Sequence, residues 1–228
     1  MSPGHGQNSP ARDAARGIYR VLSALLSYPE QALIDALPEI EAALLPQPLF
    51  HRELGCLLDH LGTHSLIELQ ETYVEQFDRS RSQSLYLFEH IHGESRERGE
   101  ALLDLLQEYQ RHGFEPNDMN GGLRELPDYL PLFLEFLGQL PAEDAGRLLG
   151  DAIDVIDLIG GRLHKHASPY AAAFRVLAAL SPVKPQPIED APAREMDALL
   201  ETVGPGDDGS EPLLKPDNGL VKPIHFYR

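Results

Sequence analysis

The sequence is poor in the residues that build disulfides, metal clusters and membrane spans. It contains one cysteine, Cys56, and no tryptophan among 228 residues. A single thiol cannot form an internal disulfide or a cysteine-rich zinc or iron–sulfur site, so a reducing compartment is expected. No stretch approaches the roughly 18 apolar residues of a membrane span, and residues 1–17 lack the apolar core of a signal peptide. We therefore expect a cytoplasmic protein that is neither exported nor inserted in a membrane.

Basic residues are also scarce. There are 19 Lys and Arg against 36 Asp and Glu, which gives a formal net charge of -17 with His neutral. A field of that sign repels phosphate backbones and anionic lipid headgroups, so nucleic acid is not an expected partner. A basic peptide or a positively charged protein face is the natural complement, although acidity also serves solubility alone.

Strand patterns are missing, whereas helical patterns are abundant. No run alternates apolar and polar residues as a half-buried strand does, and apolar residues recur at helical spacing through nearly all of residues 13–180. Hydrophobic residues make up 42% of the chain, which is enough for a folded core. The pattern predicts an all-α fold, a single-domain bundle of about eight helices over residues 13–180, after a flexible N-terminus at residues 1–12.

Several residues mark where individual helices begin and end. Ser65 and Glu68 have the spacing of a capping box, which would start a helix that ends near Asp78. Ser95 can cap a long helix that Gly113 closes.

Two prolines bear on the next helix, and two further helices follow it. Pro127 suits a first helical turn, and Pro131 indicates either a kink or the true start. The periodicity then predicts helices from Ala142 to about His164 and from Ser168 through Leu180.

The composition changes at residue 181. Residues 181–228 are rich in proline and in acidic residues, with at most one short helix near Met196 to Val203. Such a segment is either a solvated acidic tail or an arm that captures a basic partner.

Catalytic signatures are absent from the sequence. It has no glycine-rich phosphate loop, no nucleophile elbow and no HExxH helix, so we expect no active site. A metal-dependent helical hydrolase or oxygen-binding protein built on Glu89, His90 and His92 is the alternative. Residues two apart on a helix point roughly 200° from each other, so both His could bind one ion only from a strand or an irregular turn.

Charged and apolar residues around this cluster favour a structural or binding role. Acidic residues stand close in sequence to basic ones, which permits ion pairs that fix an irregular crossing between helices. The acidic members are Asp78, Glu89 and Glu94, and the basic ones are Arg79, Arg81, Arg96 and Arg98. The aromatic and aliphatic residues from Tyr73 to Phe88 are core by default, but with a charged rim they could form a groove that captures an amphipathic helix.

Three segments in this region resemble a known family. They are residues 73–78 (YVEQFD), 84–99 (SLYLFEHIHGESRERG) and 125–131 (ELPDYLP). In this order they resemble the molybdenum cofactor assembly chaperones of respiratory nitrate reductase, the NarJ-type or delta subunit, within the wider group of redox-enzyme maturation chaperones. The long Leu-x-Leu-Phe-Glu-His-x-His-Gly string makes the resemblance specific. The helices on either side match in pattern rather than in motif.

The resemblance implies a function and a set of partners. Such chaperones act in the cytoplasm on the apo catalytic (alpha) subunit of nitrate reductase, bind its N-terminal peptide, and promote insertion of bis-molybdopterin guanine dinucleotide before membrane docking, without binding a cofactor stably themselves. Cofactor-delivery proteins are possible further partners, and a generic helical adaptor is a weaker interpretation. The resemblance indicates ten positions that face the partner or shape the groove: Tyr73, Phe77, Leu85, Phe88, Glu89, His92, Glu125, Pro127, Asp128 and Tyr129.

Overall fold

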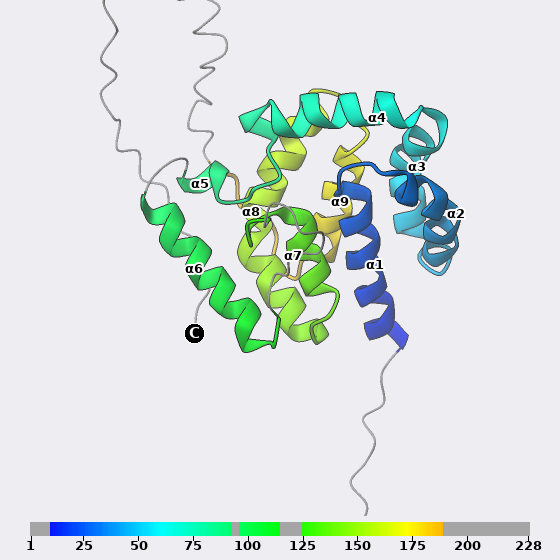
Figure 1. The fold of residues 1–228 in the computed structure, drawn as a ribbon. Helices are drawn as coiled ribbons and strands as arrows, with labels where there is room; N and C mark the ends of the chain where they lie inside the picture. Colours follow the sequence, from blue (N-terminus) through cyan, green and yellow to red (C-terminus); the bar gives the residue numbers. More distant parts are fainter. Residues whose placement is uncertain (1–9, 93–95, 115–124, 189–228) are drawn as a thin grey trace, which may run out of the picture.

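Nine α-helices make up most of residues 10–92, 96–114 and 125–188, the parts of the chain that the computed structural model describes (Figure 1). These residues contain no β-strand, and one isolated antiparallel bridge pairs Tyr86 with Tyr129. The all-α prediction is confirmed, with one helix more than the number expected. None of the described helices combines the length and the apolar character that crossing a bilayer requires.

The elements follow the chain in a simple order. The α-helices are α1 (Pro10–Leu26), α2 (Gln31–Leu44), α3 (Pro48–Thr63), α4 (Leu66–Tyr73), α5 (Glu89–His92), α6 (Arg96–Arg111), α7 (Leu130–Leu137), α8 (Ala142–Lys165) and α9 (Ala171–Leu180). A π-helical turn, η1 (Val74–Asp78), continues α4, and a 3-10 turn, η2 (Arg81–Gln83), follows it.

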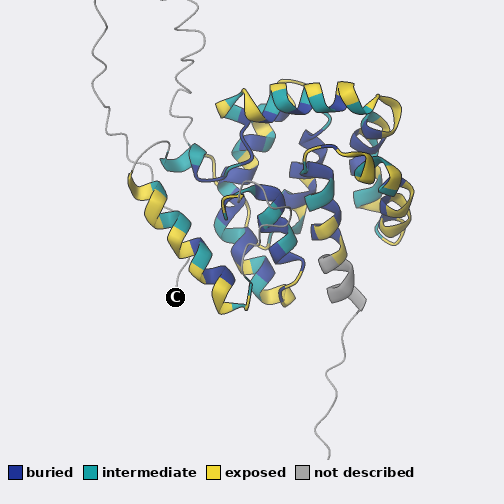
Figure 2. Cartoon of the chain, viewed as in Figure 1, coloured by how far each residue is buried: buried dark blue, intermediate teal, exposed yellow. Residues whose placement is uncertain are grey.

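The core lies where α1, α7, α8 and α9 pack together. Helix α1 runs along α7, α8 runs along α9, and α3 covers the other side of α9 with α2 outside it. Figure 1 shows α4 crossing one end of this bundle and α6 lying at its edge. The dark, buried faces in Figure 2 point inward from the helices of the bundle, while the outer faces of α2, α4 and α6 are exposed. Burying each large aliphatic side chain contributes about 1.5–3 kcal/mol, so this shared interior holds the helices together.

Helices α8 and α9 approach each other closely at a glycine. A Cβ atom added to Gly160 would lie 2.7 Å from the Cβ of Phe174. Any larger residue at this position would push the two helices apart, so the packing depends on the missing side chain.

The predicted helix signals around α4 and α6 have clear outcomes. The capping box is confirmed, since Glu68 Oε2 accepts from the Ser65 N–H at 2.8 Å and Ser65 Oγ accepts from the Glu68 N–H at 3.4 Å. The helical run ends at Asp78 as predicted, although its last turn is π-helical. Gly113 follows α6 with a φ of 78°, a conformation that glycine adopts readily. Ser95, the predicted cap, lies outside the described residues.

The start of α7 shows which of the two prolines lies in its first turn. The helix begins at Leu130 and carries Pro131 in its first turn, so Pro131 marks the true start and the placement of Pro127 in that turn is wrong. The reason is that the chain before Leu130 is bonded elsewhere. The Leu130 N–H donates to the Leu85 carbonyl at 2.8 Å, and the Pro127 carbonyl accepts from the Tyr109 hydroxyl at 2.8 Å.

The last described segment, residues 181–188, lies against α8. A Cβ atom on Gly150 would meet Val183 Cγ2 at 3.1 Å, and the Gln186 N–H donates to Asp154 Oδ1 at 2.7 Å. The remainder of the predicted proline-rich acidic tail, residues 189–228, lies outside the described residues.

Candidate functional site

The described parts of the three segments that carry the resemblance come together in space. The bridge between Tyr86 and Tyr129 joins the second segment to the third. Two hydrogen bonds flank it, from the Leu87 N–H to the Asp128 carbonyl at 3.1 Å and from the Leu130 N–H to the Leu85 carbonyl. The first segment joins them through Tyr73, whose hydroxyl lies 3.0 Å from that of Tyr129.

The backbone pairing of Tyr86 with Tyr129 sets the directions of the side chains at residues 85–87. Leu85 and Leu87 are buried with 2% exposure each, whereas Tyr86 between them is half-buried. Alternation of this kind is the signature of extended backbone, which directs neighbouring side chains to opposite sides. Tyr86 therefore faces outward while its neighbours anchor the segment in the core.

A cleft of about 330 Å³ opens beside this junction. Aromatic and charged side chains together form its lining: Phe77, Asp78, Arg81, Ser84, Tyr86, Glu89 and Arg98. Every one of these residues comes from the stretch between η1 and the first turn of α6. A mixed apolar and charged lining suits a polypeptide guest, whose apolar side chains need burial and whose charges need partners.

One edge of the cleft concentrates negative charge. Glu125 Oε2 accepts from the Tyr86 hydroxyl at 2.7 Å. Burial raises the pKa of Asp78, and the nearby charge of Glu125 raises it further. Burial also raises the pKa of the Tyr86 phenol, as does its bond to Glu125. Within the described residues no ion pair joins Asp78 or Glu125 to a basic side chain.

Two of the residues that line the cleft form an ion pair. Arg98 Nη2 in α6 lies 3.2 Å from Glu89 Oε1 in α5. The pair confirms, for these two residues, the expectation that ion pairs fix the crossing between helices. Glu94, which was named with them, lies outside the described residues.

Asp128 acts within the fold as a long-range helix cap. Its side chain is fully buried, and Oδ2 accepts the Phe88 N–H at 3.0 Å, immediately before α5. Burial raises the pKa of this carboxyl, while the bond from Phe88 and the charge of Arg98 act in the opposite direction. The first N–H groups of a helix have no partner within the helix, and Asp128 supplies one.

The ten predicted positions are brought into one region but differ in exposure. Tyr73, Phe77, Leu85, Phe88 and Asp128 are buried, Glu89, His92, Pro127 and Tyr129 are half-buried, and Glu125 is exposed. Phe77 and Glu89 line the cleft, and Glu125 is bonded to its Tyr86. The buried members anchor the segments, so contact with a partner stays a prediction for all ten.

The cleft also contains residues that the ten positions omit. They are Asp78, Arg81, Ser84, Tyr86 and Arg98. The signal for Tyr86 was present in the sequence, since Leu85, Tyr86 and Leu87 alternate apolar and amphipathic side chains. A three-residue extended stretch is too short to distinguish from loop without its pairing partner.

The histidine cluster does not form a metal site in the described part of the chain. No group of three or more His, Cys, Asp or Glu side chains there is placed to hold an ion. Both ring nitrogens of His90 are already engaged, Nε2 with the Ser84 carbonyl at 2.8 Å and Nδ1 with Arg162 at 3.1 Å. His90 therefore has no free ring nitrogen for a metal ion, and the alternative built on Glu89, His90 and His92 lacks that ligand.

Comparisons with known proteins agree on one family. A family model described as nitrate reductase delta subunit matches residues 36–175. The chain is 43% identical over 166 residues to the nitrate reductase molybdenum cofactor assembly chaperone NarJ of Escherichia coli (strain K12), covering 71% of this chain and 68% of that protein. It is 34% identical over 165 residues to a protein of Bacillus subtilis (strain 168) named "Probable nitrate reductase molybdenum cofactor assembly chaperone NarJ", covering 71% and 86%.

A solved structure supports the fold independently. It is described as a redox enzyme maturation protein from Archaeoglobus fulgidus, and it matches with a TM-score of 0.52 over 78% of this chain and 95% of that one. At 21% sequence identity the match concerns the fold alone.

Proposed function

Because the chain belongs to the nitrate reductase delta subunit family, we propose that it is a cytoplasmic chaperone that assembles the molybdenum-containing catalytic subunit of nitrate reductase. It binds the apo catalytic subunit, including its N-terminal peptide, and promotes insertion of bis-molybdopterin guanine dinucleotide before the enzyme docks at the membrane. The relatives in Escherichia coli and Bacillus subtilis are named as assembly chaperones rather than as catalytic enzymes, and the chain carries out no covalent step of its own.

One observation supports the cleft as the binding site: the described parts of the three motif segments come together beside it. The cleft can take a short stretch of polypeptide, with Tyr86 offering aromatic surface beside the buried Phe77. Aromatic side chains give large contact area for little loss of rotamer entropy, which is why they recur where proteins capture peptides.

The charges of the cleft favour a basic guest. Asp78 and Glu125 repel each other, and a Lys or Arg side chain between them would relieve that repulsion. The formal net charge of -17 draws such a guest toward the protein from a distance. An amphipathic segment with at least one basic residue therefore fits both the charge and the aromatic surface.

Release follows from the same energetics. A chaperone shifts its client toward the open apo state only by its differential affinity for that state over the closed one. When cofactor insertion closes the client, the binding surface it offers is lost, and the chaperone dissociates without an energy source.

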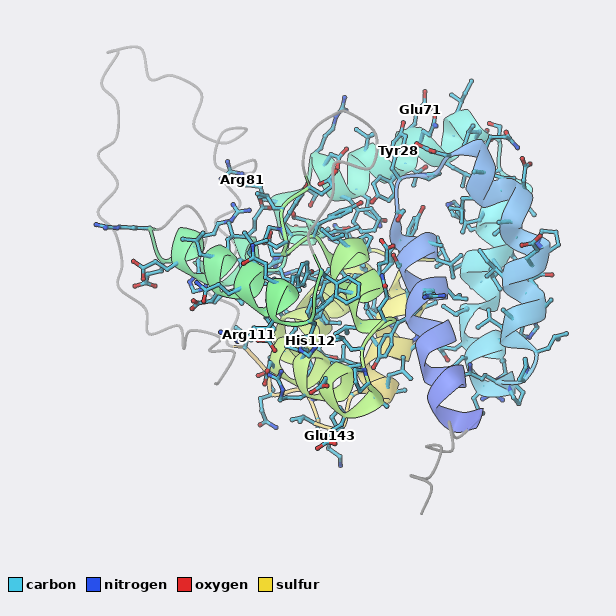
Figure 3. All side chains as sticks on the ribbon, turned by 60° about the horizontal axis from the view of Figure 1, so that its bottom comes forward. Tyr28, Glu71, Arg81, Arg111, His112 and Glu143 are labelled. Carbon is cyan, nitrogen blue, oxygen red and sulfur yellow. The ribbon has the colours of Figure 1, made fainter. Side chains whose placement is uncertain are left out.

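Calorimetry with a synthetic N-terminal peptide of the catalytic subunit tests the peptide site. We expect saturable binding that weakens about tenfold in Asp78→Asn, as for loss of a charged hydrogen bond. Glu71→Gln is the matched control, because Glu71 is an exposed acid on α4 that lies well apart from the cleft residue Arg81 (Figure 3). No heat at high micromolar peptide, or equal weakening in both variants, would contradict the assignment.

A pull-down from cells tests the order of events. The tagged chaperone should capture the catalytic subunit preferentially in cells that cannot synthesise the molybdenum cofactor. Equal capture of the mature enzyme would show that release is not linked to cofactor insertion.

A further inference from the structure

We propose that Arg162 of α8 is a positioning residue that holds one wall of the binding cleft in place. This inference rests on the proposed function for its importance, but its structural part is tested separately below. Among the described residues that line the cleft none belongs to α8, and the three motif segments do not include Arg162. The wall is the segment of residues 82–90, and Arg162 bonds to this segment without lining the cleft itself.

Arg162 forms a hydrogen bond at each end of this segment. Its Nη1 donates to the Ser82 carbonyl in η2 at 3.0 Å and to His90 Nδ1 in α5 at 3.1 Å. The cleft residues Ser84, Tyr86 and Glu89 all lie between these two points in the chain. Since α8 packs against η2 and α9 in the core, one guanidinium ties this segment to a core helix.

The contact also fixes the protonation of His90. A guanidinium can only donate hydrogen bonds, so Nδ1 must be the unprotonated nitrogen and Nε2 must carry the proton. Nε2–H then donates to the Ser84 carbonyl at 2.8 Å, which is itself part of the wall. Arg162 and the Ser84 carbonyl thus favour the same neutral tautomer of His90, and that tautomer holds Ser84.

The surroundings of His90 disfavour its doubly protonated, positively charged form. Burial lowers the pKa of His90, and the positive charge of Arg162 from α8 lowers it further. The Ser84 carbonyl and Glu89, the neighbouring residue on α5, act in the opposite direction but do not outweigh them. A proton on Nδ1 would also put two donors face to face and break the bond to Arg162.

Nitrogen NMR of the full-length protein labelled at histidine tests the structural part. In the wild type, His90 should appear as the neutral Nε2–H tautomer and stay neutral through pH 6.5, the ordinary pKa of His. In Arg162→Met, which is of similar length but has neither the charge nor a donor, His90 should titrate at higher pH. Arg162→Gln is a smaller change and provides the same readout if the Met variant unfolds.

Arg147→Met is the matched control. Arg147 lies on the same helix and pairs with Glu108 and Asp151, so its loss perturbs the fold without touching His90. The His90 tautomer and titration should match the wild type in this variant. If His90 behaves alike in all the proteins, or if Arg147→Met changes it as much as Arg162→Met, the inference is overturned.

Peptide affinity tests the link to function. At pH 7.5 the N-terminal peptide should bind Arg162→Met about tenfold more weakly than the wild type, and Arg147→Met as tightly as the wild type. An unchanged affinity in Arg162→Met overturns the positioning role. Failure of the wild type to bind the peptide contradicts the proposed function instead, and the NMR result then decides whether Arg162 fixes His90.

Discussion

The carboxylate of Asp128 accepts the backbone N–H of Phe88 at 3.0 Å, although 40 residues separate the two in the chain. Together with the paired backbone at Tyr86 and Tyr129, this bond fixes the third motif segment on the second. The shape of the cleft therefore depends on a buried polar contact as well as on apolar packing.

Substitutions at Asp128 should separate the hydrogen bond from the charge. Asp128→Ala removes the carboxylate that accepts the buried Phe88 N–H and should lower the free energy of unfolding by about 2–3 kcal/mol. Asp128→Asn should cost less, because an amide oxygen can still accept the bond and burial already disfavours the charged carboxylate. Urea unfolding followed by circular dichroism measures both. Wild-type stability in the Ala variant would show that the bond contributes nothing.

The contact between α8 and α9 predicts opposite effects at two adjacent glycines. Gly160→Ala places a methyl group against Phe174 and should lower the free energy of unfolding by about 1–3 kcal/mol. Gly161 has no atom within 4 Å of its added Cβ, so Gly161→Ala should stabilise the helix by up to about 1 kcal/mol. Thermal unfolding of the two variants side by side provides the comparison. Equal melting temperatures would argue against the close approach of the helices.

His90 should make the stability of the protein depend on pH. Because its pKa is lower in the folded than in the unfolded state, the unfolded chain takes up the proton first. The stability is therefore complete above pH 6.5, the ordinary pKa, and declines as the pH falls below it. His90→Gln cannot titrate and keeps an amide donor for the Ser84 carbonyl. The free energy of unfolding of this variant, measured relative to the wild type by urea unfolding, should therefore rise when the pH is lowered from 7.5 to 5.5. If the difference between the two proteins is the same at both pH values, His90 does not cause the pH dependence.

Two ion pairs between helices should differ in strength because they differ in burial. Glu108 of α6 has 6% of its side chain exposed and pairs with Arg111 at 2.5 Å and with Arg147 of α8 at 2.6 Å. Figure 3 shows Arg111 beside His112 at the end of α6. Glu108→Gln should lower the free energy of unfolding by about 2 kcal/mol, less than for a fully buried pair because both arginines are half exposed.

The exposed pair provides the control for Glu108. Glu53 of α3 and Arg175 of α9 pair with 38% and 50% of their side chains exposed. Solvent screens such a pair, so Glu53→Gln should change the stability by less than about 1 kcal/mol. If the two Gln variants lose equal stability in urea unfolding, burial does not control the strength of these pairs.

The helices could be predicted from the sequence because their signals are local. Helix α8 was expected from Ala142 to about His164 and ends at Lys165, since its apolar residues keep one period without a break. The capping box at Ser65 depends on residues three apart, and it too was predictable. Pro127 was misplaced because its surroundings are set by Tyr109 and Leu85, which lie far away in the chain.

The candidate site could be predicted only in part, for the same physical reason. The motif segments indicated the right region, but not which side chains face outward. That choice depends on the pairing of Tyr86 with Tyr129, which turns Tyr86 to the cleft and buries Leu85. The contact of Arg162 with His90 spans 72 residues and has no counterpart in any local pattern.

The pairing of Tyr86 with Tyr129 also sets when the cleft can form. A chain that leaves the ribosome from its N-terminus can fold α1 to α4 early, but the bridge must wait until residues 125–131 have emerged. Closing so long a loop is entropically unfavourable and slow compared with forming helices. A nascent chain therefore carries the first two motif segments for some time before the cleft can form, so the proposed binding site arises late in synthesis and all at once.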